Sequence, residues 1–294
     1  MIFVLKFIQG EIMKKNWLFN KNVIITGASG GLGFAIAKLL IFKYDCKVLG
    51  IARNKDKIEK AMLTLGEKKS NFSYLLFDVS KKDNWDSIAN SIRENNFKPD
   101  LLINNAGFML PFAKFHKYSD QEIQEIIDTN FCSVVYSTKA LLPEILKSST
   151  PAIVNISSSA GLCAVVGQSM YCATKFAVKG FTETLQQDYK KQIYIGGVYP
   201  GFIKTDILNR QTTSDKSNRL INKMMMPLDK ASKRIVKRIS KRKKRTVMGF
   251  DGCSMGFFGR LFPNFTPSLV RAVLKTSKLD LFEDVFEFTK ENTK

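Results

Sequence analysis

Residues 22–33 read NVIITGASGGLG: a β-branched run leads directly into a glycine-rich string, and a long helical pattern follows. Gly27, Gly31 and Gly33 allow a tight turn and let backbone amides at the positive end of the helix approach a pyrophosphate. A glycine-rich string alone is often only a turn. Its position between the predicted first strand and first helix favours a dinucleotide site, to which we assign Gly27, Ser29, Gly31, Leu32 and Gly33.

From this turn onward, short apolar runs alternate with longer amphipathic stretches. The predicted strands are 22–26, 47–52, 72–77, 100–104, 152–157, 193–198 and 245–249. The predicted helices are 31–43, 55–64, 83–94, 120–147, 169–190 and 229–241. Near-continuous apolar runs are typical of parallel strands that are buried on both faces. The pattern predicts an α/β fold of Rossmann type, a doubly wound and mostly parallel seven-stranded sheet with helices on both faces, which binds ligands at the carboxyl ends of its strands.

The 294 residues, 45% of them hydrophobic, contain no Pro/Gly/Ser-rich linker and fit one large domain. We expect a leader over 1–20, a single Rossmann-type domain over 21–250 and an extension over 251–294 packed on that domain. The apolar residues 1–12 are fewer than the roughly 20 needed to cross a bilayer. A purine-rich codon choice for Gln9 to Ile12 is compatible with translation starting at Met13.

The composition argues against several classes of site. Five cysteines lack C-x-x-C spacing and are odd in number, which indicates reduced thiols in a cytoplasm and no metal site. The single histidine, His116, lies in a loop-like stretch and is expected on the surface, so a proton-transfer group must be sought among other residue types. The net charge of +20 can attract anions, but it is weak evidence because lysine is plentiful throughout.

The end of the second strand discriminates between NAD and NADP. An acidic residue there accepts hydrogen bonds from the ribose 2′-hydroxyl of NAD, whereas this sequence has Ala52 followed by Arg53. A guanidinium suits a 2′-phosphate, so we favour NADP and keep NAD as the alternative. Arg53 could also simply be solvated at a helix entry, as we expect for Lys55 and Lys57.

Two further motifs follow the third and fourth strands. Asp78 and Val79 end the third strand, where the Asp78 carboxylate could accept a hydrogen bond from the adenine amino group. The string NNAG over 104–107 places Asn105, Ala106 and Gly107 where small residues would let the cofactor lie against the backbone, and its asparagines would tie strands together.

The motif order T-G-x-x-x-G-x-G, D-V, N-N-A-G, N, S, Y-x-x-x-K and P-G-x-x-x-T resembles the short-chain dehydrogenase/reductase family over about residues 21–206. The resemblance implies a catalytic Ser-Tyr-Lys set with an assisting asparagine. Tyr171 and Lys175 match Y-x-x-x-K, and Asn130 matches the asparagine. Of the three serines in NISSSAG, the family spacing of thirteen residues before the tyrosine selects Ser158.

The resemblance also implies the role of each residue. Tyr171 would exchange a proton with the substrate oxygen. Lys175, one helical turn further on, is expected to lower the pKa of the tyrosine from about 10 and to bind the nicotinamide ribose. Ser158 would hydrogen-bond the substrate oxygen, and Asn130 would hold a proton-relaying water. In PGFIKT, the residues implied at the nicotinamide are Pro200, Gly201, Ile203 and Thr205.

Beyond these motifs, alternatives stay open. The resemblance implies that 207–226 of the catalytic domain covers the substrate, and Met224, Met225 and Met226 in it could line an apolar substrate pocket or fill the core. The stretch 229–246 has an apolar stripe at helical spacing and a basic face, which fits a helix packed on the sheet; no aromatic residue interrupts its charges, which argues against nucleic acid. A peripheral membrane contact stays open because of the apolar residues Phe257, Phe258, Leu261, Phe262 and Phe265.

The sequence thus predicts a cytoplasmic NADP(H)-dependent oxidoreductase that interconverts a carbonyl and an alcohol, with an apolar small-molecule substrate. Family members are often dimers or tetramers, so we expect a homodimer or homotetramer built on the helices at 120–147 and 169–190. The alternative is a membrane-associated or regulatory NADP(H)-binding protein with a vestigial site.

Overall fold

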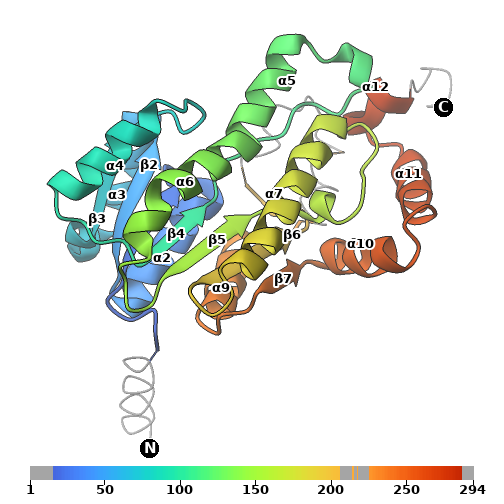
Figure 1. The fold of residues 1–294 in the computed structure, drawn as a ribbon. Helices are drawn as coiled ribbons and strands as arrows, with labels where there is room; N and C mark the ends of the chain where they lie inside the picture. The colour runs from blue at the N-terminus through green and yellow to red at the C-terminus, as the bar shows by residue number, and fades with distance from the viewer. Residues whose placement is uncertain (1–15, 206–213, 215–216, 218–224, 287–294) are drawn as a thin grey trace, which may run out of the picture.

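The protein is built on one seven-stranded sheet with the strand order β3-β2-β1-β4-β5-β6-β7, in which every pairing is parallel (Figure 1). The computed structural model describes residues 16–205, 214, 217 and 225–286. The strands are β1 (Asn22–Thr26), β2 (Lys47–Ala52), β3 (Phe72–Leu76), β4 (Leu101–Asn104), β5 (Ala152–Ile156), β6 (Tyr194–Pro200) and β7 (Arg245–Met248). The predicted doubly wound α/β fold is confirmed.

Helices cover both faces of the sheet, as the alternating sequence pattern predicts. They are α2 (Gly31–Tyr44), α3 (Lys55–Leu63), α4 (Asn84–Glu94), α5 (Asp120–Ile127), α6 (Ser133–Ile145), α7 (Ser169–Asp188) and α9 (Leu228–Ile239). One core cluster joins the sheet to α2, α3 and α9, and a second joins its other face to α4 and α6. Short 3-10 turns, η1 (Gly66–Asn71), η2 (Phe115–Lys117) and η4 (Ser159–Gly161), complete the connections.

The central strands are buried on both faces, which explains their apolar composition. All residues of β4, β5 and β6 are buried, and buried apolar side chains are the main favourable contribution to folding. Asn104 and Asn155 are the polar exceptions in β4 and β5. Asn104 donates to Asn155 Oδ1 (2.9 Å) and accepts from Ser137 Oγ (2.7 Å), so these buried amides are satisfied as they join β4, β5 and α6.

The helix predicted over 120–147 is two helices joined by a π turn, η3 (Asp128–Cys132). A capping box at Ser119 and Glu122 starts α5, because each side chain satisfies a backbone amide of the other residue. The π turn adds a residue to the helical repeat, and such turns often occur at functional sites. Asn130 lies within it and is fully buried.

The N-terminal boundary of the domain differs from the expected one at 21. Leu18 is fully buried in the core, and the Trp17 indole donates to Ile239 O (3.2 Å) and lies edge-on to the Tyr194 ring. Described residues of the expected leader therefore pack on α9 and β6. The expected start at Met13 lies outside the described residues.

The basic stretch 229–246 forms α9 and the connection to β7. Ala231, Ile235, Val236 and Ile239 are buried against α2 and the sheet, and the lysines and arginines lie on the opposite face. The amphipathic packing predicted from its spacing is confirmed.

The C-terminal extension follows β7 as α10 (Phe250–Leu261), α11 (Thr266–Thr276), η6 (Asp280–Phe282) and α12 (Glu283–Phe286) (Figure 1). Its helix α10 packs on β7 and η4. Leu279, Leu281, Phe282 and Val285 return to the domain and join a third apolar cluster that includes Tyr171. Among the described helices, none has the length and apolarity to cross a bilayer.

Candidate active site

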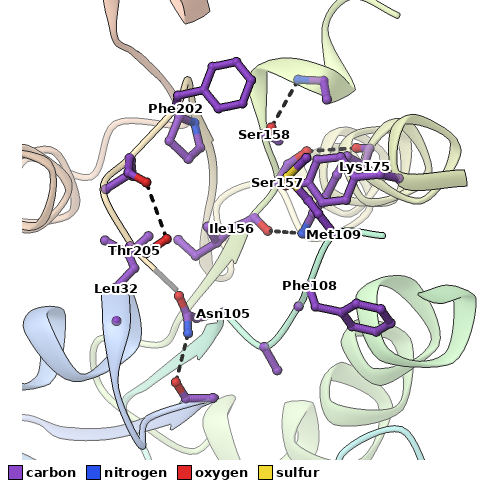
Figure 2. A pocket seen from close by; sticks show the side chains of 18 of the residues that line it. Leu32, Asn105, Phe108, Met109, Ile156, Ser157, Ser158, Lys175, Phe202 and Thr205 are labelled. Carbon is purple, nitrogen blue, oxygen red and sulfur yellow. Dashed lines mark hydrogen bonds between the residues drawn. The ribbon is translucent and has the colours of Figure 1, made fainter. Parts of the chain in front are cut away.

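A pocket of about 390 Å³ lies at the carboxyl ends of the strands, where the doubly wound topology predicts a ligand (Figure 2). The predicted site residues that line it are Gly27, Ser29, Gly31, Leu32, Arg53, Asn105, Ala106, Gly107, Ser158, Tyr171, Lys175, Pro200, Gly201, Ile203 and Thr205. The predicted residues that do not line it are Gly33, Asp78, Val79 and Asn130. The structure therefore brings most of the predicted set into one cavity.

The glycine-rich turn is held by side chains from the neighbouring strand. Gly27 has a φ of +67°, which favours glycine, and a Cβ there would lie 3.0 Å from Ala106 Cα. Asn105 Nδ2 donates to Thr26 O (3.0 Å), and Thr26 Oγ1 accepts from the Asn105 and Ala106 amides. The predicted tie between strands by these asparagines is thus present, and it fixes the turn that faces the pocket.

Gly33 serves packing rather than the pocket. A Cβ at Gly33 would overlap Gly27 O and lie 2.5 Å from Asn105 Nδ2. Because Gly33 lacks a side chain, α2 can begin close to the glycine-rich loop.

The first turn of α2 carries no acidic residue, and no side chain caps its N-cap residue, Gly30. The helix therefore presents its positive end to the pocket, which fits a pyrophosphate.

Arg53 lies at the end of the pocket beyond β2. Its guanidinium is 3.7 Å from Asp78 Oδ2, while Asp78 Oδ1 accepts from the Ser80 amide (3.0 Å) and hydroxyl (2.7 Å). Burial raises the pKa of Asp78, but the Ser80 hydrogen bonds and the Arg53 charge outweigh burial and leave it below its usual range. Val79 is buried in the second core cluster, so its side chain serves packing.

Lys57 is exposed at the start of α3, as expected from the sequence, and it also lines this end of the pocket. Its stem crosses the turn: a Cβ on Gly30 would lie 3.0 Å from Lys57 Cε. Two cations, Arg53 and Lys57, thus converge on the side of the pocket formed by β2 and α3.

Tyr171 is buried at the other end, in the first turns of α7. Burial raises the pKa of its hydroxyl to about 12, against a smaller lowering by its hydrogen bond with Ser158. We expected Lys175 to lower this pKa, whereas the shift found is upward because burial is its largest cause. Lys175 Nζ lies over the Tyr171 ring, 5.6 Å from its centre.

Lys175 is also buried, and its ammonium donates to Ile156 O (3.3 Å) (Figure 2). Burial lowers the pKa of this lysine to about 8. Gly107 faces it, since a Cβ there would lie 3.2 Å from Lys175 Nζ and 3.1 Å from Asn130 Oδ1. Asn130 and Lys175 therefore flank the same stretch of backbone.

Asn130 acts as a clamp on that backbone. Its Oδ1 accepts from the Phe108 amide (2.9 Å), and its Nδ2 donates to Phe108 O (2.9 Å) and to Thr174 Oγ1 (3.3 Å). The π turn orients Asn130 for these bonds. They join η3, the loop after β4 and α7, so Asn130 positions the pocket wall next to Lys175.

The structure distinguishes the serines of NISSSAG. Ser157 is buried, and its hydroxyl donates to Lys175 O (2.8 Å), which holds α7 against the end of β5 (Figure 2). Ser158 is partly exposed in the pocket, with its hydroxyl accepting from the Ala160 amide (3.2 Å) and hydrogen-bonded to Tyr171. A Cβ on Gly161 would lie 2.5 Å from Lys175 O, so the glycine lets η4 lie close to α7. Ser159 is buried and also lines the pocket, so the choice of Ser158 stays a prediction.

Comparison with known proteins identifies the fold and motif set together. The family model described as short chain dehydrogenase matches residues 21–216, about two thirds of the chain. The chain belongs to the short-chain dehydrogenase family. It is an oxidoreductase of this family, as the sequence predicted.

One relative in sequence and two solved structures of the same fold are similar to this chain. The chain is 36% identical over 194 residues to the 3-oxoacyl-[acyl-carrier-protein] reductase FabG of Chlamydia trachomatis, covering 65% of this chain and 77% of FabG. A Burkholderia phymatum short chain dehydrogenase/reductase in complex with NAD aligns with a TM-score of 0.69 and 21% identity, over 78% of this chain and 88% of that one. An alcohol dehydrogenase from Thermococcus sibiricus complexed with 5-hydroxy-NADP aligns with a TM-score of 0.67 and 24% identity, over 77% of this chain and 93% of that one.

The turn after β6 contacts a residue of the extension that was not among the predicted site residues. Pro200 and Gly201 end β6, and Thr205 Oγ1 lies 3.5 Å from Ile203 O. Asp251, in the first turn of α10, accepts from the Phe202 amide (2.7 Å), and a Cβ on Gly201 would overlap its carboxylate. The only sequence signal for it was an acid just after a strand and a glycine, a pattern too common to single it out.

The remaining wall is apolar and comes from several segments. Met109, Phe112, Val165, Phe202 and Met255 line it together with Gln168, whose Nε2 donates to Leu110 O (2.9 Å). Phe282 of the extension packs edge-on to Phe112, with ring centres 4.9 Å apart. Met226 pairs with Ile203 and packs on the first core cluster, Met225 is partly buried, and Met224 lies outside the described residues with most of 207–226.

Proposed function

We propose that this protein transfers a hydride between NADPH and the carbon of an apolar carbonyl or alcohol, with Tyr171 as the general acid and base at the substrate oxygen. The observation that carries the proposal is the single pocket that runs from Arg53 and Lys57, past the glycine turn, to Ser158, Tyr171 and Lys175. Glycines line its cofactor side, where an added Cβ would meet neighbouring atoms, so the cavity suits a flat, extended dinucleotide.

In the direction of reduction, the bound cofactor would supply the hydride to the carbonyl carbon. The oxygen then gains negative charge, and the Tyr171 hydroxyl would give it a proton while the Ser158 hydroxyl donates a hydrogen bond. Burial raises the pKa of Tyr171 to about 12, so at neutral pH the tyrosine holds the proton that reduction consumes.

Lys175 and Asn130 would restore the site after each turnover. The Lys175 ammonium, with its pKa lowered to about 8, is a proton donor suited to neutral pH. Its position over the Tyr171 ring and beside Gly107 supports contacts with the tyrosine and with the nicotinamide ribose. The Asn130 side chain bonds both the amide and the carbonyl oxygen of Phe108, which supports a positioning role in addition to the water-holding role that the resemblance implies.

The preference for NADP rests on the charge around β2. Arg53 and Lys57 both line the pocket there, and Ala52 occupies the position where an NAD site usually has an acid. The Asp78 carboxylate pairs with Arg53 at 3.7 Å, which would orient the guanidinium toward a 2′-phosphate.

The test is an assay of NADPH oxidation against a panel of apolar ketones and acyl thioesters of 3-oxo acids, with NADH in parallel. Tyr171→Phe should lower kcat about a thousandfold while NADPH binding is kept, since only the proton donor is lost. Arg53→Gln should lower kcat/KM for NADPH about tenfold or more and leave that for NADH nearly unchanged. Full activity of Tyr171→Phe would refute the catalytic role, and equal losses with both cofactors would refute the role of Arg53.

We also propose a cytoplasmic homo-oligomer formed through α6 and α7. Phe176 of α7 is 42% exposed, and nothing in the described structure lies within 4 Å of a Cβ built on Gly180, so this face can accept another helix. Light scattering on the purified protein tests this. A Phe176→Glu variant should dissociate the oligomer, and a monomeric wild type would rule it out.

A further inference from the structure

The helix α10 has its glycines turned toward the domain and its large apolar side chains turned away from it. Gly252, Gly256 and Gly259 face inward, where added Cβ atoms would lie 3.0–3.1 Å from Gly201, Leu162 and neighbouring backbone. Phe257, Phe258 and Leu261 are all exposed. A helix on the surface of a soluble domain normally has the opposite arrangement, with its apolar side chains packed on the core.

The apolar surface continues into the next helix. Phe262 and Phe265 lie in the connection, and Leu269 and Val273 lie one turn apart on α11. All four are exposed, while the one buried residue of α11 is Thr266. An eleven-residue helix is marginal in water unless tertiary packing supports it. We name the outer surface the Phe257–Val273 face; it consists of Phe257, Phe258, Leu261, Phe262, Phe265, Leu269 and Val273.

The helices that carry this face are basic. Residues 250–278 contain four basic side chains, Arg260, Arg271, Lys275 and Lys278, and one acidic side chain, Asp251, whose carboxylate accepts from the Phe202 amide. Arg245 and Arg260 border a groove with Phe257 and Leu261. Figure 1 shows α10 and α11 at the edge of the molecule, on the side away from α3 and α4.

We propose that the Phe257–Val273 face docks on the surface of an anionic phospholipid bilayer. Aromatic and aliphatic side chains would enter the boundary between headgroups and acyl chains, and the surrounding arginines and lysines would contact lipid phosphates. A second copy of this chain fits less well, because two such basic surfaces would repel each other across the interface. Nucleic acid also fits less well, since the centre of the face is apolar rather than charged.

Docking would place the bilayer next to the substrate end of the pocket. The inner side of α10 contributes Met255 to the pocket wall, while its outer side carries Phe257 and Phe258. The same helix therefore separates the pocket from the proposed lipid surface. The docking itself does not depend on the proposed reaction, so its test needs no turnover.

The experiment is co-sedimentation of the full-length protein with vesicles of phosphatidylcholine alone or mixed with phosphatidylglycerol. We expect binding to the mixed vesicles and little binding to phosphatidylcholine. Phe257→Ser/Phe265→Ser should lower the partition coefficient at least about tenfold, because two aromatic rings no longer enter the lipid. Arg260→Gln/Lys275→Gln should lower it by about fivefold or more.

A matched control is Phe42→Ser/Leu63→Ser, which removes two exposed apolar side chains from α2 and α3. It should bind as the wild type does, and circular dichroism should give all variants the wild-type Tm within a few degrees. A second readout uses Cys253, the exposed cysteine, which lies one turn from Phe257. A polarity-sensitive dye there should shift to the blue on mixed vesicles.

Three results would overturn the proposal. Wild-type protein that stays in the supernatant with mixed vesicles would show that lipid does not cover the face. Equal binding by Phe257→Ser/Phe265→Ser and wild type would show that another surface binds. An oligomer that the same variant dissociates, without vesicle binding by the wild type, would assign the face to a second copy of the chain.

Discussion

Helices α2 and α10 both start just after a strand at the carboxyl edge of the sheet, yet their first turns differ in charge. The first turn of α2 has no acidic residue and faces the pocket across glycines. The first turn of α10 carries Asp251, whose carboxylate lies against Gly201 and accepts from the Phe202 amide. One helix start leaves its positive end for an external anion, and the other supplies an anion from the protein itself. The first is suited to binding and the second to fastening the extension.

Making α2 resemble α10 should have the largest effect. Leu32→Asp places a carboxylate in the first turn of α2, where it would repel a pyrophosphate and neutralise the positive end of the helix dipole. We expect the Kd for NADPH, measured by fluorescence titration, to rise about a hundredfold. Leu32→Asn is the neutral control of the same shape, and it should raise Kd far less. Equal effects of the two variants would mean that packing, not charge, matters there.

Removing the anion from α10 should have the next largest effect. Asp251→Ala leaves the Phe202 amide without its acceptor and frees the turn at Pro200 and Gly201 from the extension. We expect kcat/KM for the cofactor, measured at a saturating concentration of the carbonyl substrate, to fall about thirtyfold because KM for the cofactor rises. Ser254→Ala, on the same helix, removes a hydroxyl that bonds only Phe250 O and Asp251 O and should be nearly silent. A loss confined to thermal stability would argue against positioning of the cofactor.

The activity of the pocket that α2 faces should also depend on pH, because Lys175 adds a titrating charge to this pocket. Its pKa is lowered to about 8, so the ammonium is present below that pH and is lost above it. The rate of carbonyl reduction should therefore be nearly level below about pH 7, be halved at about pH 8 and fall roughly a further fivefold from pH 8 to pH 9. Lys175→Arg keeps its charge over this range and should remove the fall, at a lower maximum rate. A wild-type profile that stays flat to pH 10 would contradict this.

The smallest effect is expected from Gly256→Ala in α10. Its new Cβ would lie 3.1 Å from Leu162 Cδ1, the end of a side chain that can move, and alanine favours a helix interior. The free energy of unfolding should change by less than about 1 kcal/mol. Gly33→Ala in α2 would instead overlap the carbonyl oxygen of Gly27, so its loss in denaturant titration should be several times larger. Similar losses would show that α2 and α10 tolerate added bulk equally.

The parts of the fold and site that were predictable are those encoded by local spacing. The turn at Gly27 to Gly33 and the pair Tyr171–Lys175 each lie within one junction or one helix face, so their neighbours in sequence are their neighbours in space. The interruption of the helix at 128–132 was not predicted, because no proline or glycine marks it. The direction of the Tyr171 pKa shift was mispredicted, since helix spacing places Lys175 near the ring but says nothing about desolvation.

The individual contacts of the extension with the pocket wall could not be predicted from its own residues. Asp251 meets Phe202, and Phe282 meets Phe112, across long separations in sequence. Neither pair has a spacing rule, because the path of the chain between the partners decides whether they meet. Lys57 is exposed at the start of α3, as expected, but its place at the pocket was not foreseen, because it depends on how α3 packs beside the glycine turn.

The packing of Phe282 on Phe112 also bears on how the protein is made. During synthesis, Phe112 and Tyr118 leave the ribosome long before Leu279 to Val285, which cover them. The nascent domain can close its sheet while this apolar wall is still open to other chains and to chaperones. A chain truncated after β7 would then retain most of its fold but expose the apolar wall at its substrate end, which would favour aggregation.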